Sequence, residues 1–172
     1  FLAIVLDGTV ITNPFTDNSD AYLVGIWFDN GRGVVNNCTI QEFADTNRTD
    51  QTGVGIFVDD NSDNGVTVQY SNIYNNEVGI RVEGDNATIQ RNRIEDNTTG
   101  IYTSSGSSLD VHENNFYLGS NSDTSFNDQN SSTISASNNH WVNESGSVCS
   151  YTGAWFGTGS WSSFTGCANI TN

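Results

Sequence analysis

This chain of 172 residues is short of several residue types, and each shortage excludes something. Lysine and methionine do not occur, proline occurs once, and five arginines stand against 20 acidic residues, for a formal net charge of −15. A surface of this sign repels nucleic-acid phosphates, so we expect no nucleic-acid partner. No hydrophobic run is long enough to span a bilayer and no stretch resembles a signal peptide, so we expect no direct insertion into a membrane.

The acidic excess has two interpretations. Surface carboxylates keep an ordinary protein soluble, and they also suit a protein that works in high salt, where the repulsion between them is screened. The complete absence of lysine favours the second interpretation. It predicts that the source is a halophilic microbe or one of its viruses.

Three cysteines are too few for a disulfide framework. Cys38 lies inside a repeat and reads as a small buried residue. Cys149 and Cys167 bracket a loop rich in glycine, serine and aromatic residues, which predicts a disulfide and an extracellular location, at a cell or virion surface. Six glycosylation sequons agree with that location, with chance matches as the alternative. Their acceptors are Asn47, Asn86, Asn97, Asn130, Asn143 and Asn169.

What the chain does contain is a repeated unit of strand, corner and strand. Its clearest copy spans Val66–Ile73, where two alternating apolar residues precede a polar corner and one apolar residue follows it. We place the first copy on Ala3, Val5, Gly8 and Val10. Repeats separated by 21 to 33 residues are typical of a solenoid. Six copies occur, with corners at Gly8, Cys38, Ser71, Asn92, Asn114 and Asn139.

A second repeated word, Gly-Ile, precedes four of these copies and predicts a third strand in each unit. Its glycines are Gly25, Gly55, Gly79 and Gly100. A three-stranded unit of this size cannot bury its apolar face alone, so we expect the units to stack at ~4.8 Å. The isoleucine of each word then faces the core, and the corner asparagines form a hydrogen-bonded ladder. Because there is no initiating methionine and Phe1 falls within a repeat, we expect a processed chain or a piece of a longer one.

These repeats resemble those of the right-handed parallel β-helix superfamily, which includes pectate lyases, polygalacturonases and viral tailspikes. They are most similar to the plain Gly-Ile and Asn-x-Ile repeats of periplasmic and archaeal surface β-helix proteins. The resemblance implies an all-β fold over residues 1–145, a right-handed, single-stranded parallel β-helix of about six coils with an asparagine corner ladder. We expect residues 146–172 to form an aromatic, glycine- and serine-rich C-terminal cap, closed by the disulfide.

One outward row is the candidate binding site. The residue after each Gly-Ile word points away from the core, which aligns Trp27, Phe57, Arg81 and Tyr102, with Asp59 at the neighbouring strand end. We expect the glycines of the words to leave the other flank of the row open. Aromatic faces beside carboxylates suit a sugar chain, because apolar ring faces stack and carboxylates accept from hydroxyls. The alternative is an interface that a loop, the C-terminal tail or another subunit covers.

The same face also suggests a catalytic alternative. Asp59 and Glu83, one coil apart, could form a glycosidase carboxylate pair at about 5 Å. However, the paired aspartate motifs, the Gly-His-Gly and the Arg-x-Lys of polygalacturonase-like sites are not present, and Arg81 is the only base on the row. We therefore expect no catalytic residues and no cofactor. A calcium ion held by Asp59, Asp60 and Glu83 is the alternative to that expectation.

The sequence thus predicts a non-catalytic extracellular β-helix module, a cell-surface or virion structural or adhesion protein that binds a glycan along the outward row. The alternative is a polysaccharide lyase or glycoside hydrolase that uses the carboxylates of that face. The expected partners are a polysaccharide or host-surface glycan, and other subunits of the same assembly.

Overall fold

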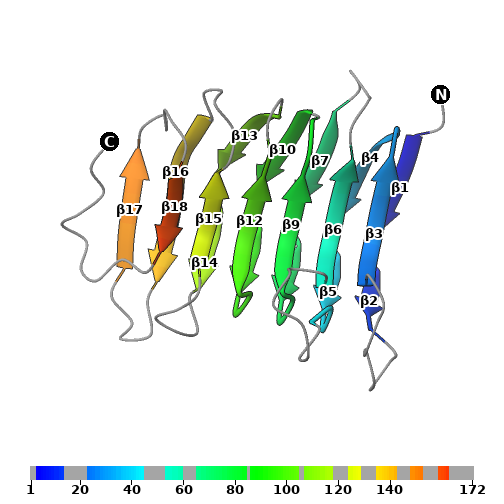
Figure 1. The fold of residues 1–172 in the computed structure, drawn as a ribbon, viewed down its shortest axis with the longest axis horizontal. Helices are drawn as coiled ribbons and strands as arrows, with labels where there is room; N and C mark the ends of the chain where they lie inside the picture. Colours follow the sequence, from blue (N-terminus) through cyan, green and yellow to red (C-terminus); the bar gives the residue numbers. More distant parts are fainter. Residues whose placement is uncertain are drawn as a thin grey trace.

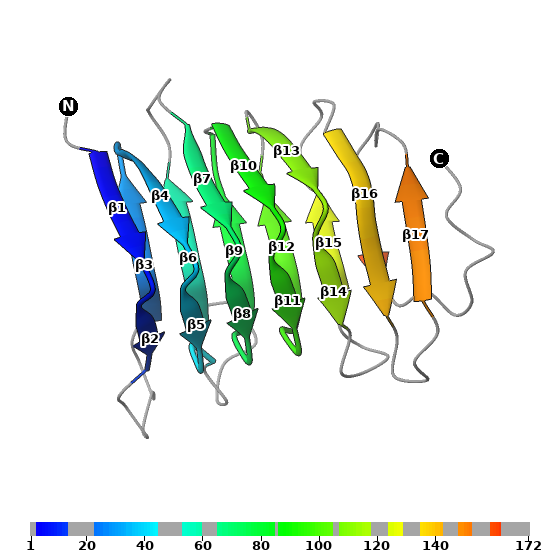
Figure 2. The same ribbon diagram turned by 180° about the vertical axis from the view of Figure 1, so that it is seen from behind.

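The chain winds into a solenoid of short β-strands whose turns stack along one axis (Figures 1 and 2). The structure, a computed structural model, describes residues 3–13, 23–44, 53–59, 65–84, 86–104, 107–117, 124–128, 135–142, 148–152 and 159–162. Every regular element in these ranges is a β-strand. Among the described residues there is accordingly no helix that could cross a membrane.

Twelve strands form one sheet that bends at a corner into two walls. Before the corner lie β1 (Ala3–Asp7), β4 (Arg32–Asn36), β7 (Val66–Gln69), β10 (Asn86–Gln90), β13 (Ser108–His112) and β16 (Ser135–Val142). After the corner lie β2 (Val10–Thr12), β5 (Thr39–Gln41), β8 (Asn72–Tyr74), β11 (Arg93–Glu95) and β14 (Asn115–Tyr117). The long strand β16 continues through the corner and pairs with both β13 and β14. The twelfth strand is β17 (Val148–Thr152).

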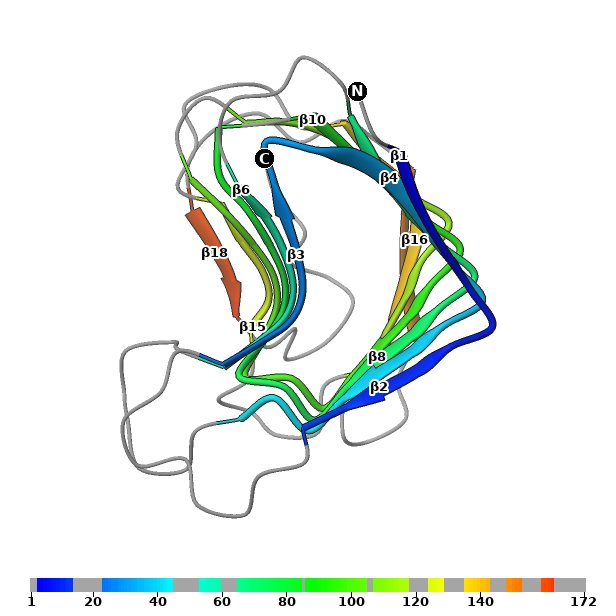
Figure 3. The same ribbon diagram turned by 90° about the vertical axis from the view of Figure 1, so that its right-hand side faces the viewer.

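Six strands form the second sheet, the third wall of the solenoid (Figure 3). They are β3 (Leu23–Asp29), β6 (Gly53–Asp59), β9 (Val78–Val82), β12 (Thr99–Thr103), β15 (Thr124–Asp128) and β18 (Gly159–Ser162). Neighbouring turns pair in parallel from β3 to β15. The fold is therefore an all-β parallel solenoid of about four turns. Each complete turn has three strands, from β3–β4–β5 to β12–β13–β14, and β1–β2 and β15–β16 flank them.

The parallel register aligns equivalent apolar residues of successive turns inside the solenoid. Ile40, Ile73 and Ile94 follow one another in the wall after the corner and are 0 to 2% exposed. The same row ends in Phe116 and Trp141, whose rings stack with centroids 5.6 Å apart. The expected burial of the Gly-Ile isoleucines is observed as well, and Ile56, Ile80 and Ile101 are fully buried.

The register corrects our placement of the first repeat by one residue. Ile4 pairs with Gly33, and Ile11 pairs with the buried Ile40, so Ile4 and Ile11 face the core. Val5 and Val10, which we expected inside, face outward and are each 66% exposed. Because side chains alternate between faces along a strand, a shift of one residue exchanges every side chain of the segment.

A glycine explains the error. Gly8 is not the corner residue but the residue before it, which adopts the left-handed conformation with φ 62°. Its equivalents in the next two turns, Asn37 and Tyr70, have φ values of 52° and 51°. The first corner residue is therefore Thr9, whose carbonyl accepts a hydrogen bond from the Thr39 N–H at 2.9 Å.

The C-terminal strands run opposite to the solenoid strands. β17 pairs antiparallel with β16, and β18 pairs antiparallel with β15. Cys38 is buried with a free thiol. Cys167, and with it the predicted disulfide to Cys149, lies outside the described residues.

Candidate functional site

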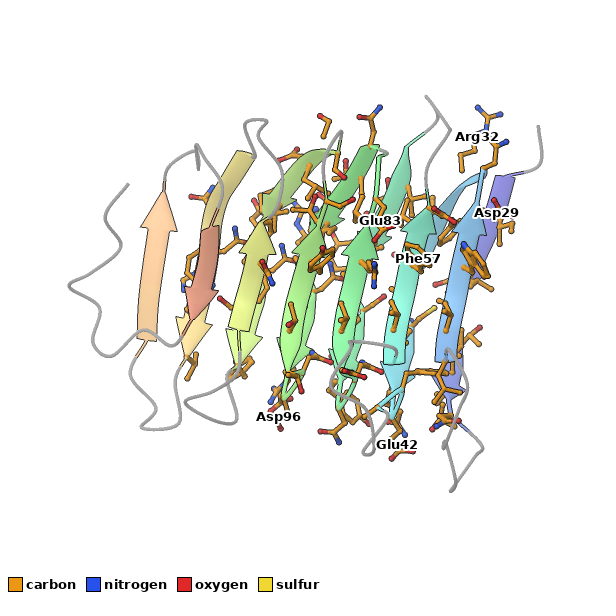
Figure 4. The ribbon with its side chains drawn as sticks, in the orientation of Figure 1. Asp29, Arg32, Glu42, Phe57, Glu83 and Asp96 are labelled. Atoms are coloured by element: carbon orange, nitrogen blue, oxygen red, sulfur yellow. The ribbon has the colours of Figure 1, made fainter. Side chains whose placement is uncertain are left out.

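The pairing register places the outward row side by side on the second sheet. Trp27 is the register partner of Phe57, Phe57 of Arg81, and Arg81 of Tyr102. Figure 4 shows Phe57 on the outside of this sheet, with Glu83 and Asp29 toward the strand ends. One residue from each of four successive turns thus builds the row.

The side chains of the row contact one another. The rings of Trp27 and Phe57 stack with centroids 5.7 Å apart and an interplanar angle of 22°. The guanidinium carbon of Arg81 lies 5.5 Å from the ring centroid of Phe57 and 5.1 Å from that of Tyr102. Arg81 therefore sits between two aromatic rings, an arrangement in which cation and ring quadrupole attract each other.

The positive charge of Arg81 is also paired. Its Nε donates a hydrogen bond to Oε1 of Glu83 at 2.6 Å, and its Nη2 forms an ion pair with the same oxygen. Glu83, one of the two carboxylates considered for catalysis, is thus bound to Arg81. No group of three or more His, Cys, Asp or Glu side chains suited to a metal occurs within the described ranges, and Asp60 lies outside them.

Exposure changes sharply along the row. Trp27 is 52% exposed, whereas Phe57 is 6% exposed and packs with Val54 and Val78 in a small apolar cluster outside the main core. Tyr102 packs against that cluster and is half-buried. The row is consequently not the continuous open strip that we expected, because each side chain covers the next and Trp27 alone keeps a large exposed area.

The flank beside the row, which we expected to be open, is filled by backbone. A Cβ atom on Gly55 would lie 2.7 Å from the carbonyl oxygen of Gly79, and one on Gly79 would lie 2.6 Å from that of Gly100. Real Cβ atoms do not approach so closely. The glycines of the Gly-Ile words therefore let successive turns pack against each other.

Inside the corner, asparagine side chains form the hydrogen-bonded series that we name the inner ladder. The backbone N–H and the Nδ2 of Asn92 both donate to Oδ1 of Asn114 at 3.0 Å. Asn114 donates in the same way to Oδ1 of Asn139, at 2.9 and 3.0 Å. Toward the N-terminus, the Ser71 N–H donates to Asn92 Oδ1 and the Cys38 N–H donates to Ser71 Oγ. All three asparagines are 0 to 1% exposed.

A second buried asparagine series, which follows the third strand of two turns, was not predicted from the sequence. The Phe43 N–H donates to Oδ1 of Asn76 at 3.1 Å, and the N–H and Nδ2 of Asn76 donate to Oδ1 of Asn97 at 3.0 and 2.9 Å. The available signal was spacing, since Asn76 and Asn97 each follow an inner-ladder residue, Ser71 or Asn92, by five positions.

This second series corrects one expected glycosylation site. Asn97 is 3% exposed, and its Nδ2 donates to the Ile73 carbonyl at 3.0 Å, so the folded chain leaves no room for a glycan on that nitrogen. Asn86, at the start of β10, is exposed. The remaining four acceptors, Asn47, Asn130, Asn143 and Asn169, lie outside the described residues.

On the outer face of the wall before the corner, polar side chains form a series that we name the outer ladder. Gln69 Nε2 donates to Asn36 Oδ1 at 3.0 Å, and Gln90 Nε2 donates to Gln69 Oε1 at 2.9 Å. The series ends at Asp7, which accepts from Asn36 Nδ2 at 2.7 Å. It begins at His112, whose Nε2 lies 2.8 Å from Gln90 Oε1.

Two further arginines pair with carboxylates across the outer surface. Arg91 Nε lies 2.6 Å from Glu113 Oε2, and Arg93 Nε lies 2.6 Å from Glu95 Oε2. The hydrogen bond from Arg93 holds the pKa of Glu95 below its ordinary value, and the pKa of Arg93 is raised in turn. Each of these two arginines is thus paired with a neighbouring glutamate.

Comparison with known proteins addresses the family rather than the site. The family model described as the right-handed β-helix region matches residues 24–169. The search of curated proteins found no match, and the search of solved structures found none either. The predicted β-helix repeat is confirmed both by this match and by the stacked parallel turns. The chain belongs to the right-handed β-helix family.

Proposed function

We propose that the chain is a non-catalytic β-helix module of an extracellular cell-surface or virion assembly, with a glycan contact at the exposed end of the outward row. One observation carries the proposal: neighbouring side chains of the row contact one another. Trp27 stacks on Phe57, and Arg81 lies between Phe57 and Tyr102. Side chains arranged in this way stiffen the wall of a scaffold, because each one fixes the position of the next.

The same contacts weigh against the hydrolase or lyase alternative. A glycosidase needs two carboxylates that face the scissile bond with room for the sugar between them. Glu83 instead accepts a hydrogen bond from Arg81 at 2.6 Å, and Arg81 is held between two rings. Before Glu83 could act on a sugar, its ion pair with Arg81 would have to break.

Trp27 supplies the glycan contact in our proposal. Its ring stacks on Phe57 on one side, and the residue remains 52% exposed. Asp29, two positions along the same strand, is exposed as well. An indole face beside a carboxylate suits a sugar ring, since the apolar ring face stacks while hydroxyls donate to the carboxylate.

Binding of neutral and acidic oligosaccharides, measured by isothermal titration calorimetry, tests this proposal. We expect Trp27→Ala to weaken binding roughly tenfold, which corresponds to about 1.4 kcal/mol for a lost stacking contact. Tyr70→Asn is the matched control, because Tyr70 is 51% exposed on another face and asparagine tolerates its φ of 51°. Equal affinity of the Trp27→Ala variant would reject the glycan contact, and release of reducing ends or unsaturated sugars would favour the enzyme.

The extracellular location is tested separately, by mass spectrometry of peptides from the secreted chain. Glycan on the exposed Asn86 together with unmodified Asn97 is the expected result. A chain recovered only from the interior of the cell, with Asn86 bare, would contradict the location without touching the fold.

A further inference from the structure

The residue before each corner has a left-handed backbone conformation, and its type changes along the solenoid. The six residues at this position, with φ values from 51° to 62°, are Gly8, Asn37, Tyr70, Arg91, Glu113 and Asn138. Glycine and asparagine tolerate this conformation. Other residue types are disfavoured, because their Cβ atom lies close to the following carbonyl oxygen and no short polar side chain offsets the clash. The three disfavoured residues occupy consecutive turns, and we name them the corner ridge: Tyr70, Arg91 and Glu113.

The side chains of the corner ridge contact one another in water. Arg91 Nε donates to Glu113 Oε2 at 2.6 Å, and its Nη1 donates to the Tyr70 hydroxyl oxygen at 2.8 Å. Tyr70 is 51% exposed, and the side chains of Arg91 and Glu113 are 45% and 42% exposed. Exposed pairs of this kind contribute little to stability, so they do not explain why three unfavourable residues occupy these positions.

The exposure of the corner ridge does not depend on the ends of the chain. Its residues directly follow β7, β10 and β13, and each of these strands is paired with a described strand on both sides. The corner that carries them is convex in the view along the solenoid axis (Figure 3). Backbone strain that the contacts of the fold do not require is typical of binding sites, where it holds side chains in place for a partner.

The wall after the corner adds further polar groups beside the ridge. Arg93, two residues after Arg91, is exposed, and its register partners Asn72 and Asn115 are exposed as well. Arg93 Nε and Nη2 donate to the two carboxylate oxygens of Glu95. Within the described residues, Nη2 of Arg91 and Nη1 of Arg93 donate to no acceptor. The corner therefore presents two guanidinium donors at a short distance from each other.

We propose that the corner ridge, together with Arg93, binds an extended segment of a partner protein that carries both acidic and basic side chains. Carboxylates of the segment accept from the remaining Nη groups of Arg91 and Arg93. A basic side chain donates to Glu113, and an apolar side chain lies on the ring of Tyr70. Tyrosine and arginine are the residue types that often dominate protein interfaces. This site is separate from the glycan contact at Trp27, so each of the two can fail while the other stands.

Charge and shape favour this partner over others. A nucleic acid or an acidic polysaccharide carries one sign of charge, cannot pair with Glu113, and is repelled by a net charge of −15. A second copy of the chain would bring an equally acidic, rigid body to a convex corner. Two such bodies touch along a line, whereas a stable interface buries roughly 1,200 Å² or more. A flexible segment can follow the corner and contact both walls.

The first test separates a ridge that binds from one that only stabilises the fold. The triple variant Tyr70→Asn/Arg91→Asn/Glu113→Asn places at all three positions the residue type that Asn37 and Asn138 already provide. Because asparagine tolerates the left-handed conformation, we expect the urea midpoint to rise or to stay unchanged. A clear fall of the midpoint would show that the ridge contacts serve stability, and it would overturn the proposal.

The second test measures binding. A displayed library of short random peptides is selected on the wild-type chain and counter-selected on the triple variant. We expect the selected peptides to combine acidic and basic residues. Synthetic copies should bind the wild type roughly tenfold or more tightly than the triple variant in calorimetry. Arg93→Gln should weaken this binding several-fold. Arg32→Gln is the matched control, because Arg32 is exposed at the end of β4 away from the corner, and it should leave binding unchanged.

Three results of the peptide experiment would overturn the proposal. The first is that no selected peptide distinguishes the wild type from the triple variant. The second is that the selected peptides carry one sign of charge only, which would point to a purely anionic or cationic ligand. The third is that Arg93→Gln and Arg32→Gln have the same effect on binding.

Discussion

Two ladders of side-chain hydrogen bonds follow the same wall, one on each face. Asn92 belongs to the inner ladder and Gln90, two residues earlier, to the outer ladder, so both come from one turn. Asn92 is 1% exposed, whereas Gln90 is half-buried. The difference in exposure sets the energetics, because water replaces a lost partner on the outer face but cannot reach the inner one.

The largest expected effect on stability comes from adding a side chain at a glycine that packs against the second asparagine series. Gly79→Ala would place its Cβ 2.6 Å from the Gly100 carbonyl oxygen and 3.3 Å from Cγ of Asn97. We expect a loss of about 3 kcal/mol in the free energy of unfolding, measured by urea denaturation, since overpacking forces the backbone of two turns apart. Gly31→Ala is the control, because its nearest neighbour would be Asp29 O at 3.7 Å, an ordinary contact, and its midpoint should stay close to that of the wild type.

The second effect compares the two ladders directly. Asn92→Leu removes the acceptor of the Ser71 N–H and the donor to the Val68 carbonyl, both buried, and should cost about 1–3 kcal/mol. Gln90→Leu, in the same turn on the outer face, should change stability by no more than about 0.5 kcal/mol. Equal urea midpoints for the two variants would remove the distinction between the ladders.

Salt should change stability through the charges of the outer surface and should not affect the contribution of the inner ladder. The net charge of −15 predicts that stability rises from low to molar salt, because repulsion between surface carboxylates is screened. The rise should be smaller than the loss from Asn92→Leu, and it should be equal in the wild type and in that variant. A thermal midpoint that is flat across this range would remove the argument for a halophilic source.

The smallest effect concerns one ion pair of the outer face. The pKa of Glu95 is lowered in the folded chain by the hydrogen bond from Arg93, so the stability it contributes is present above the unfolded pKa and is lost as the pH falls through the folded pKa. Glu95→Gln should therefore reduce stability at pH 7 by on the order of 0.5 kcal/mol, as expected for a surface pair, and the reduction should shrink below pH 4.5 and vanish once the pH lies below the lowered pKa of the folded chain. Urea midpoints at pH 7 and pH 3 measure the difference, and an unchanged gap at pH 3 would contradict the assignment.

The repeating strands could be predicted because apolar alternation and the recurring Gly-Ile word both occur in the sequence of each repeat. The first turn was misplaced because Gly8 resembles a corner residue, whereas it holds the left-handed position that Asn37 and Tyr70 fill in later turns. Glycine and asparagine both tolerate that conformation, so residue type does not separate the position before the corner from the corner itself. Only pairing with β4 fixes the register.

The candidate row shows a different limit. The order of Trp27, Phe57, Arg81 and Tyr102 follows from the spacing of the words and could be predicted. Their exposure could not, because it depends on side-chain directions: the ring of Trp27 lies on Phe57, and Arg81 turns toward both Phe57 and Tyr102. The burial of Asn97 escaped prediction for a related reason, since its sequon looks the same whether the amide faces water or the Ile73 carbonyl.

The two ladders also differ in direction. In the outer ladder each side-chain amide donates toward the N-terminal end, as from Gln90 to Gln69. In the inner ladder the Nδ2 of Asn92 donates in both directions, to Asn114 in the following turn and to the Val68 carbonyl in the preceding turn. A solenoid lengthened by more turns of this kind would extend both lines, and each added inner asparagine would tie three successive turns together.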